Sequence, residues 1–310
     1  MKEEQKAVNV GPAGIEVAYQ RFGDPGAPPV LLVMGVAVQM FGWPEGFCAE
    51  LVARGVQVIR FDNRDVGLST HFPDAPVADI GAALGGDLSS VSYTLSDMAA
   101  DAVGLLDALG LDSAHLVGMS MGGAIAQTAA IEHPGRVRSL TSMMSTTGDL
   151  AVGQANRDAL DALAGPQPTN RQEVIDQRVR IAKALGSPGF ATDEAAVADR
   201  AARSYDRSYD PLGVVRQAAA SVASGDRTER LRWLELPTLV IHGADDAMCD
   251  VSGGKATAAA VPGAELVVFD GMGHDLPREL WSEIATLITG LVQRAEPAPL
   301  SSSDRTPRRR

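Results

Sequence analysis

The 310-residue chain has little of what marks nucleic-acid-binding, secreted or membrane-spanning proteins. It carries 27 Lys and Arg against 39 Asp and Glu, a net charge of −12, whereas a nucleic-acid-binding protein needs a basic face. Its two cysteines are too few for a disulfide framework. No uninterrupted apolar run approaches the roughly 20 residues of a membrane helix. We therefore expect neither a nucleic-acid nor a membrane partner.

Motifs for metals and phosphates are also missing. The sequence contains no H-E-x-x-H pattern, and residues 253–256 (GGKA) lack the first glycine and the terminal Ser or Thr of a P-loop. We expect no cofactor and no metal. Residues 1–9 are charged where a signal peptide would be apolar, which favours the cytoplasm.

The remaining composition is typical of a globular protein, with 45% hydrophobic and 21% charged residues. Short β-branched runs alternate with amphipathic stretches, which predicts an α/β fold with a mostly parallel central sheet flanked by helices. The expected strands are residues 30–34, 56–62, 114–118, 137–143, 238–242 and 265–269.

The long segment between the expected strands at residues 137–143 and 238–242 has a different composition. Residues 146–232 are rich in Ala, Arg, Asp and Gln at helical spacing, which predicts a helical cap inserted into a core of residues 1–145 and 233–294. Residues 295–310 are rich in Ser, Pro and Arg, which predicts a disordered basic tail. The sequence does not indicate an oligomeric state.

The clearest chemical motif is Gly-x-Ser-x-Gly at residues 118–122. It follows a predicted strand and precedes a helical pattern, as in a nucleophile elbow, where a strained turn exposes the serine at the start of a helix. Ser120 is therefore the candidate nucleophile.

The nucleophile needs an acid and a histidine base, which follow it in this order in folds with such an elbow. His274 lies in a glycine-rich loop after the last predicted strand and is the candidate base, whereas His242 ends a strand. Asp245 and Asp246 both follow the preceding strand, and only one of them can orient the histidine.

Acyl transfer also needs two donors for the developing oxyanion. The backbone N–H of Met121 begins the elbow helix, and that of Val36 follows Gly35 after the first buried strand. Both are candidate oxyanion-hole donors.

These motifs together resemble the α/β-hydrolase superfamily, and within it the esterases near aclacinomycin methylesterase and the cofactor-free haloperoxidase-like hydrolases. The resemblance rests on residues 31–35, 60–69, 118–122, 237–246 and 271–277. It implies an α/β-hydrolase fold with a helical lid after the sixth strand. It also implies the triad Ser120, Asp246 and His274, because the family's acid stands three residues after the glycine at position 243.

The expected function is hydrolysis of a small carboxylic ester, of the carboxylesterase or methylesterase type, through an acyl-enzyme on Ser120. Candidate substrate contacts are Gly35, Met119, Met144 and Tyr205, and several methionines near the elbow favour an apolar acyl or polycyclic group. Perhydrolases and C–C bond hydrolases share the triad, and a ligand receptor without turnover shares the fold. The sequence alone does not separate these alternatives. It also leaves open the role of the tandem RSYDRSYD motif at residues 203–210.

Overall fold

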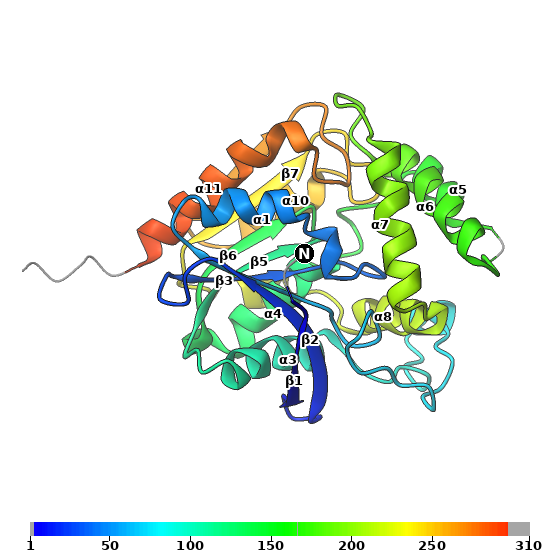
Figure 1. Ribbon diagram of the computed structural model, residues 1–310, viewed down its shortest axis with the longest axis horizontal. Coiled ribbons are helices and arrows are strands. Elements are labelled where there is room, and N and C mark those ends of the chain that lie inside the picture. Colours follow the sequence, from blue (N-terminus) through cyan, green and yellow to red (C-terminus); the bar gives the residue numbers. More distant parts are fainter. Residues whose placement is uncertain (1–2, 166, 297–310) are drawn as a thin grey trace, which may run out of the picture.

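A computed structural model describes residues 3–165 and 167–296 of the chain, built around a central eight-stranded sheet (Figure 1). The strand order is β1-β2-β4-β3-β5-β6-β7-β8; β1 and β2 join in antiparallel fashion, and the pairs from β4 to β8 are parallel. The strands are β1 (Gln5–Val10), β2 (Ile15–Phe22), β3 (Pro29–Val33), β4 (Gln57–Phe61), β5 (Ala114–Met119), β6 (Val137–Met143), β7 (Thr238–Gly243) and β8 (Glu265–Phe269).

The six strands expected from apolar runs are confirmed as β3 to β8. The inner strands β3, β4 and β7 are buried at every residue, because helices cover both faces of a parallel sheet. The hairpin of β1 and β2 was not predicted. Four of the six residues of β1 are exposed, so this edge strand lacks the apolar run that marked the others.

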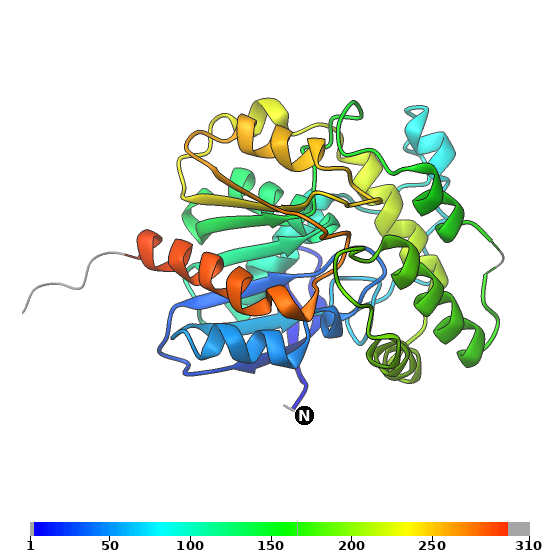
Figure 2. The ribbon, with the colours of Figure 1, turned by 90° about the horizontal axis from the view of Figure 1, so that it is seen from above.

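Helices lie on both faces of the sheet (Figure 2). One core cluster joins the sheet to α1 and α11, and the other joins it to α3, α4 and α10. No helix among the described residues is long and apolar enough to cross a bilayer. The bounds are α1 (Glu45–Val52), α2 (Ile80–Leu84), α3 (Leu95–Ala108), α4 (Met121–Glu132), α10 (Ser252–Ala260) and α11 (Trp281–Ala295), with 3-10 turns at Met40–Gly42, Pro134–Arg136 and Arg278–Leu280.

The segment between β6 and β7 is helical. Its members α5, α6, α7 and α8 gather on one side of the molecule (Figure 1). The bounds are α5 (Arg157–Leu163), α6 (Arg171–Leu185), α7 (Glu194–Arg207), α8 (Pro211–Ala223) and α9 (Thr228–Leu231). We call residues 146–232 the insert. The expected tail starts inside described structure, because Ala295 ends α11 and Glu296 bonds to His115; residues 297–310 lie outside the described residues.

The tandem motif of the insert contacts the core. Arg207 pairs with the buried Asp62, and with Glu4 at 2.7 Å. The rings of Tyr205 and Tyr209 contact each other in a tilted arrangement with centroids 5.2 Å apart, and the Tyr209 hydroxyl donates to the carbonyl of Pro168. The motif therefore tethers the insert to the core and packs the insert against itself.

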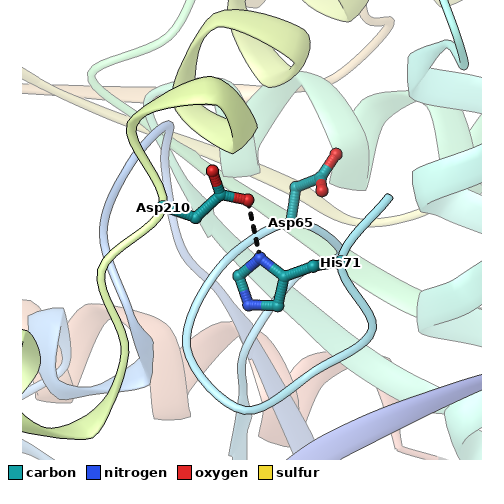
Figure 3. A group of neighbouring side chains, drawn as sticks. All are labelled: Asp65, His71 and Asp210. Atoms are coloured by element: carbon teal, nitrogen blue, oxygen red, sulfur yellow. Dashed lines mark hydrogen bonds and ion pairs between the residues drawn. The ribbon is translucent and has the colours of Figure 1, made fainter. Parts of the chain in front are cut away.

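A second tether joins α8 and its N-cap to the loop after β4 (Figure 3). Asp210 accepts a hydrogen bond from His71 at 2.8 Å, and Asp65 lies beside this pair. Asp65, His71 and Asp210 place one potential metal-ligand atom each within 4.8 Å of one another, a grouping that their sequence spacing does not reveal. Arg216 donates to both oxygens of Asp65, at 2.8 and 2.7 Å, and to Asp210. The guanidinium thus provides the counter-charge of these carboxylates.

Candidate active site

Ser120 sits in a strained turn between β5 and α4. Its backbone has φ 58° and ψ −126°, a conformation that L-residues rarely adopt. The flanking glycines permit this turn, because a Cβ on Gly118 would lie 2.1 Å from the carbonyl oxygen of Gly122, and one on Gly122 would lie 2.1 Å from that of Val33. Strand, turn and helix therefore pack at a distance that excludes side chains at both positions.

Three side chains from different parts of the chain form one hydrogen-bonded series. His274 Nε2 lies 3.0 Å from Ser120 Oγ, and His274 Nδ1 lies 2.7 Å from Asp246 Oδ2. Asp246 follows β7, His274 follows β8, and both loops leave the carboxyl ends of neighbouring parallel strands. In such a series the histidine can accept the serine proton while the carboxylate stabilises the imidazolium.

The two adjacent aspartates point in different directions. Asp246 is buried, and its Oδ1 accepts the backbone N–H groups of Met248 and Cys249 at 2.9 and 2.8 Å, which leaves Oδ2 for His274. Asp245 is exposed and accepts the N–H of Gly271. The structure thus brings Asp246, and not Asp245, to the histidine.

His242 supports the same loop. Its Nε2 lies 2.7 Å from the carbonyl oxygen of Cys249, to which it donates, and 3.6 Å from Asp246 Oδ2. Burial lowers the pKa of His242. The buried imidazole of His242 therefore holds the turn whose N–H groups bind Asp246.

The turn after β3 lies directly against the nucleophile. A Cβ on Gly35 would lie 3.0 Å from Ser120 Cβ, so only glycine fits without displacement. Asn63 donates to the Met34 carbonyl at 2.8 Å, and Ala37, at φ 63°, donates its N–H to Gln217 of the insert at 2.9 Å. These contacts fix the turn that carries the Val36 N–H, while Met121 contributes the first N–H of α4, which has no intrahelical partner.

The insert also contacts the histidine loop, which sequence spacing did not indicate. His274 donates its backbone N–H to the carbonyl of Leu185 at 2.7 Å. Ser187 accepts the N–H of Gly273 at 2.9 Å and donates to the carboxylate of Asp275. Burial raises the pKa of Asp275, and the hydrogen bond from Ser187 opposes that shift. The loop that carries the base is therefore held by the end of α6 and the residues after it.

Of the four residues predicted to contact the substrate, two lie beside Ser120 and two lie elsewhere. Met119 is half-buried beside Ser120, and Gly35 is buried against it. Met144 is fully buried and packs in the core cluster with Met143 and Ile241, which argues against direct contact with a substrate. Tyr205 is half-buried within the insert, where its ring contacts that of Tyr209.

Comparison with known proteins matches this chain to a family with the same fold. The family model described as alpha/beta hydrolase fold matches residues 28–277. Rhodomycin D methylesterase DnrP of Streptomyces peucetius is 29% identical, over 86% of this chain and 91% of that protein. The 2-hydroxymuconate semialdehyde hydrolase of Pseudomonas putida is 29% identical, over 66% of this chain and 71% of that protein. The crystal structure of esterase RhEst1 from Rhodococcus sp. ECU1013 is similar with a TM-score of 0.69 and 26% identity, covering 93% of this chain and 99% of that one.

Proposed function

Because the chain belongs to the alpha/beta hydrolase family, we propose that it is a serine hydrolase that cleaves a carboxylic ester. The observation that carries this proposal is the hydrogen-bonded series of Ser120, His274 and Asp246 at a strained turn. The Streptomyces relative is a methylesterase by name, which makes a methyl ester a natural first candidate.

The proposed reaction has two halves. His274 takes the proton from Ser120 Oγ as the oxygen attacks the ester carbonyl, and the N–H groups of Val36 and Met121 bind the resulting oxyanion. The C–O bond of the ester then breaks, and the alcohol leaves with the proton from His274. Water, deprotonated by His274, next attacks the acyl-enzyme and releases the acid with Ser120 restored.

We also propose that the insert acts as a cap that selects the substrate. Support comes from its contacts with both sides of the site: Gln217 binds the turn after β3, and Leu185 and Ser187 bind the histidine loop. The half-buried Met119 beside Ser120 suits an apolar acyl or polycyclic group.

A C–C bond hydrolase is the second candidate, because the Pseudomonas relative is a 2-hydroxymuconate semialdehyde hydrolase by name. Such a reaction would use the same series with a carbon leaving group in place of the alcohol. The two candidate functions can be separated by measuring kcat/KM on two kinds of substrate. Methyl and p-nitrophenyl esters test ester hydrolysis, and a vinylogous 1,5-diketone acid tests cleavage of a carbon–carbon bond.

The decisive experiment replaces Ser120. We expect Ser120→Ala to lower kcat for ester hydrolysis by about 10⁴-fold or more with the fold intact, because the turn depends on backbone and glycines. A fluorophosphonate should add one phosphonyl group to the wild type and none to the variant, as intact mass spectrometry would show. Activity of Ser120→Ala within tenfold of the wild type would contradict the proposal, and absence of both turnover and adduct in the wild type would indicate a ligand receptor.

A further inference from the structure

The insert carries two arginines on neighbouring helices that pack against each other. Arg178 on α6 and Arg200 on α7 are half-buried, and neither forms a salt bridge with any residue that the structure describes. Other arginines of the insert pair with carboxylates, among them Arg171 with Asp206, Arg203 with Asp199, Arg207 with Asp62 and Arg216 with Asp65. Arg180 and Arg227 also form no salt bridge with a described residue, but Arg180 is exposed and Arg227 donates to Gln127 and to two backbone carbonyls.

Arg178 reaches the turn that faces the nucleophile. Its Nη2 donates to the carbonyl oxygen of Ala37 at 3.3 Å, a long hydrogen bond. Ala37 directly follows Val36, the proposed oxyanion donor. A guanidinium has five N–H donors, so most of the donors of Arg178 remain available for another group.

Arg200 acts on the loop that carries the histidine. It lies on α7, which packs against α6, and it interacts electrostatically with Asp275, the neighbour of His274. Arg178 and Arg200 also interact with each other as like charges. The two cations therefore span the region between the turn after β3 and the histidine loop.

The physical setting of this pair is unfavourable without a counter-ion. Burial lowers the pKa of both arginines, and the charge of Arg200 lowers that of Arg178 further. Removing charge from water is costly unless an opposite charge compensates it. Arg200 interacts with Asp275 at more than salt-bridge distance, and no carboxylate among the described residues forms a salt bridge with Arg178.

We infer that Arg178 and Arg200 bind a carboxylate on the ester substrate. This inference rests on the proposed esterase function and adds a charged group to a substrate that is otherwise apolar. A carboxylate fits because its two oxygens accept paired N–H groups of a guanidinium at about 2.7–2.9 Å. The substrate would then be an ester that also carries a free acid.

The position of Arg178 limits the length of such a substrate. The Arg178 guanidinium donates to the carbonyl of Ala37, the residue after Val36, so we place the bound carboxylate within about two residue lengths, roughly 7 Å, of the N–H that would bind the oxyanion. A spacer of roughly two to four carbons between the two carboxyl groups would span this separation. Half-esters of succinic, glutaric and adipic acid have this form.

The test compares charged and neutral esters of matched shape. Monoethyl and diethyl esters of the three diacids place the carboxylate on the acyl side, and 4-acetoxybutanoate with its methyl ester places it on the alcohol side. The ratio of kcat/KM for the charged to the neutral member is measured in the wild type, Arg178→Gln, Arg200→Gln and the double variant. Arg180→Gln is the matched control, because Arg180 lies on the same helix but is exposed.

We expect the wild type to prefer the charged member on one side of the ester, and that side identifies where the carboxylate lies. Arg178→Gln and Arg200→Gln should each lower the ratio by about ten- to a hundredfold, the scale of a hydrogen-bonded charge, and Arg180→Gln should leave it unchanged. A ratio below one in the wild type, or a ratio that the Arg178 and Arg200 variants do not change, would overturn the inference.

A failure of the proposed function has a different signature. If the wild type hydrolyses none of the esters, including p-nitrophenyl acetate, the esterase proposal fails, and calorimetric titration with glutarate then tests the arginine pair by itself. Binding that Arg178→Gln weakens at least tenfold, and Arg180→Gln does not, supports the carboxylate site. Absence of glutarate binding overturns it.

Discussion

At the scale of single residues, the site contains a backbone conformation and a buried charge that are unfavourable unless neighbouring groups stabilise them. Ser120 has a positive φ, and the glycines at 118 and 122 allow backbone contacts that any Cβ would prevent. Asp246 is buried yet accepts two backbone N–H groups, which stabilise its charge beside His274. The turn and the loop thus hold the serine and the histidine in contact before any substrate binds.

The two aspartates give a residue-scale prediction. Asp246→Asn should lower kcat by about 10⁴-fold, because an amide at this position favours the wrong tautomer of His274. Asp245→Asn should lower kcat by less than about tenfold, because Asp245 is exposed and its carboxylate binds only the N–H of Gly271 among the hydrogen bonds described. Steady-state kinetics on one ester checks both, and a reversed order of the two losses would show that Asp245 orients the base.

At the scale of elements, the insert and the histidine loop form one unit. The backbone N–H of His274 donates to Leu185, and a Cβ on Gly273 would lie 2.3 Å from the carbonyl oxygen of Gly186. Ser187 and Gly273 are 86 residues apart in the chain, yet they share a hydrogen bond. A displacement of α6 would therefore move the loop that carries the base.

Substitution of Ser187 tests this coupling, because Ser187 is a positioning residue that acts through the loop carrying His274. Ser187→Ala removes the acceptor of the buried Gly273 N–H, which costs about 1–3 kcal/mol, and frees Asp275 from its donor. We expect kcat to fall about tenfold with KM nearly unchanged, because the substrate-binding groups stay in place while His274 is less well oriented.

The matched control for this prediction is Ser282→Ala, on the exposed side of α11, which should leave kcat unchanged. Parallel measurement of kcat, KM and melting temperature distinguishes the two serines. A rise in KM at constant kcat for Ser187→Ala would mean that Ser187 serves substrate binding rather than the position of the base.

At the scale of the whole molecule, buried ion pairs join the insert to the core. The side chains of Arg216 and Asp65 are 1% and 0% exposed, so removing either one leaves an uncompensated charge in the interior. The pair also bonds to Tyr93 and Asp210, which extends the network from α8 to the start of α3. The insert is thus attached by charge as well as by packing.

Substitution of Arg216 measures this attachment. Arg216→Met should lower the free energy of unfolding by about 3–5 kcal/mol, the scale for breaking a buried pair. Arg230→Met breaks the surface pair with Glu132 and should cost less than about 1 kcal/mol. Urea unfolding followed by circular dichroism checks both, and equal losses for the two variants would show that the network does not hold the insert.

The sequence by itself determined the parts of this protein that depend on local pattern. Apolar β-branched runs predict β3 to β8, because a strand buried on both faces tolerates little else. The Gly-x-Ser-x-Gly pattern at residues 118–122 predicts the elbow, because only glycines allow that turn. The choice of Asp246 over Asp245 came from resemblance to a family, since two adjacent carboxylates on a turn look alike in a sequence.

Only the tertiary structure decided which side chains meet. Met144 follows a strand near the elbow, as a pocket residue would, yet its side chain packs in the core. Ser187 and Arg178 belong to an ordinary amphipathic texture in the insert, and they reach the site through contacts with Asp275 and Ala37 that lie 88 and 141 residues away in the chain. Periodicity indicates which residues share a face of a helix, but the packing of that helix on distant loops depends on the fold as a whole.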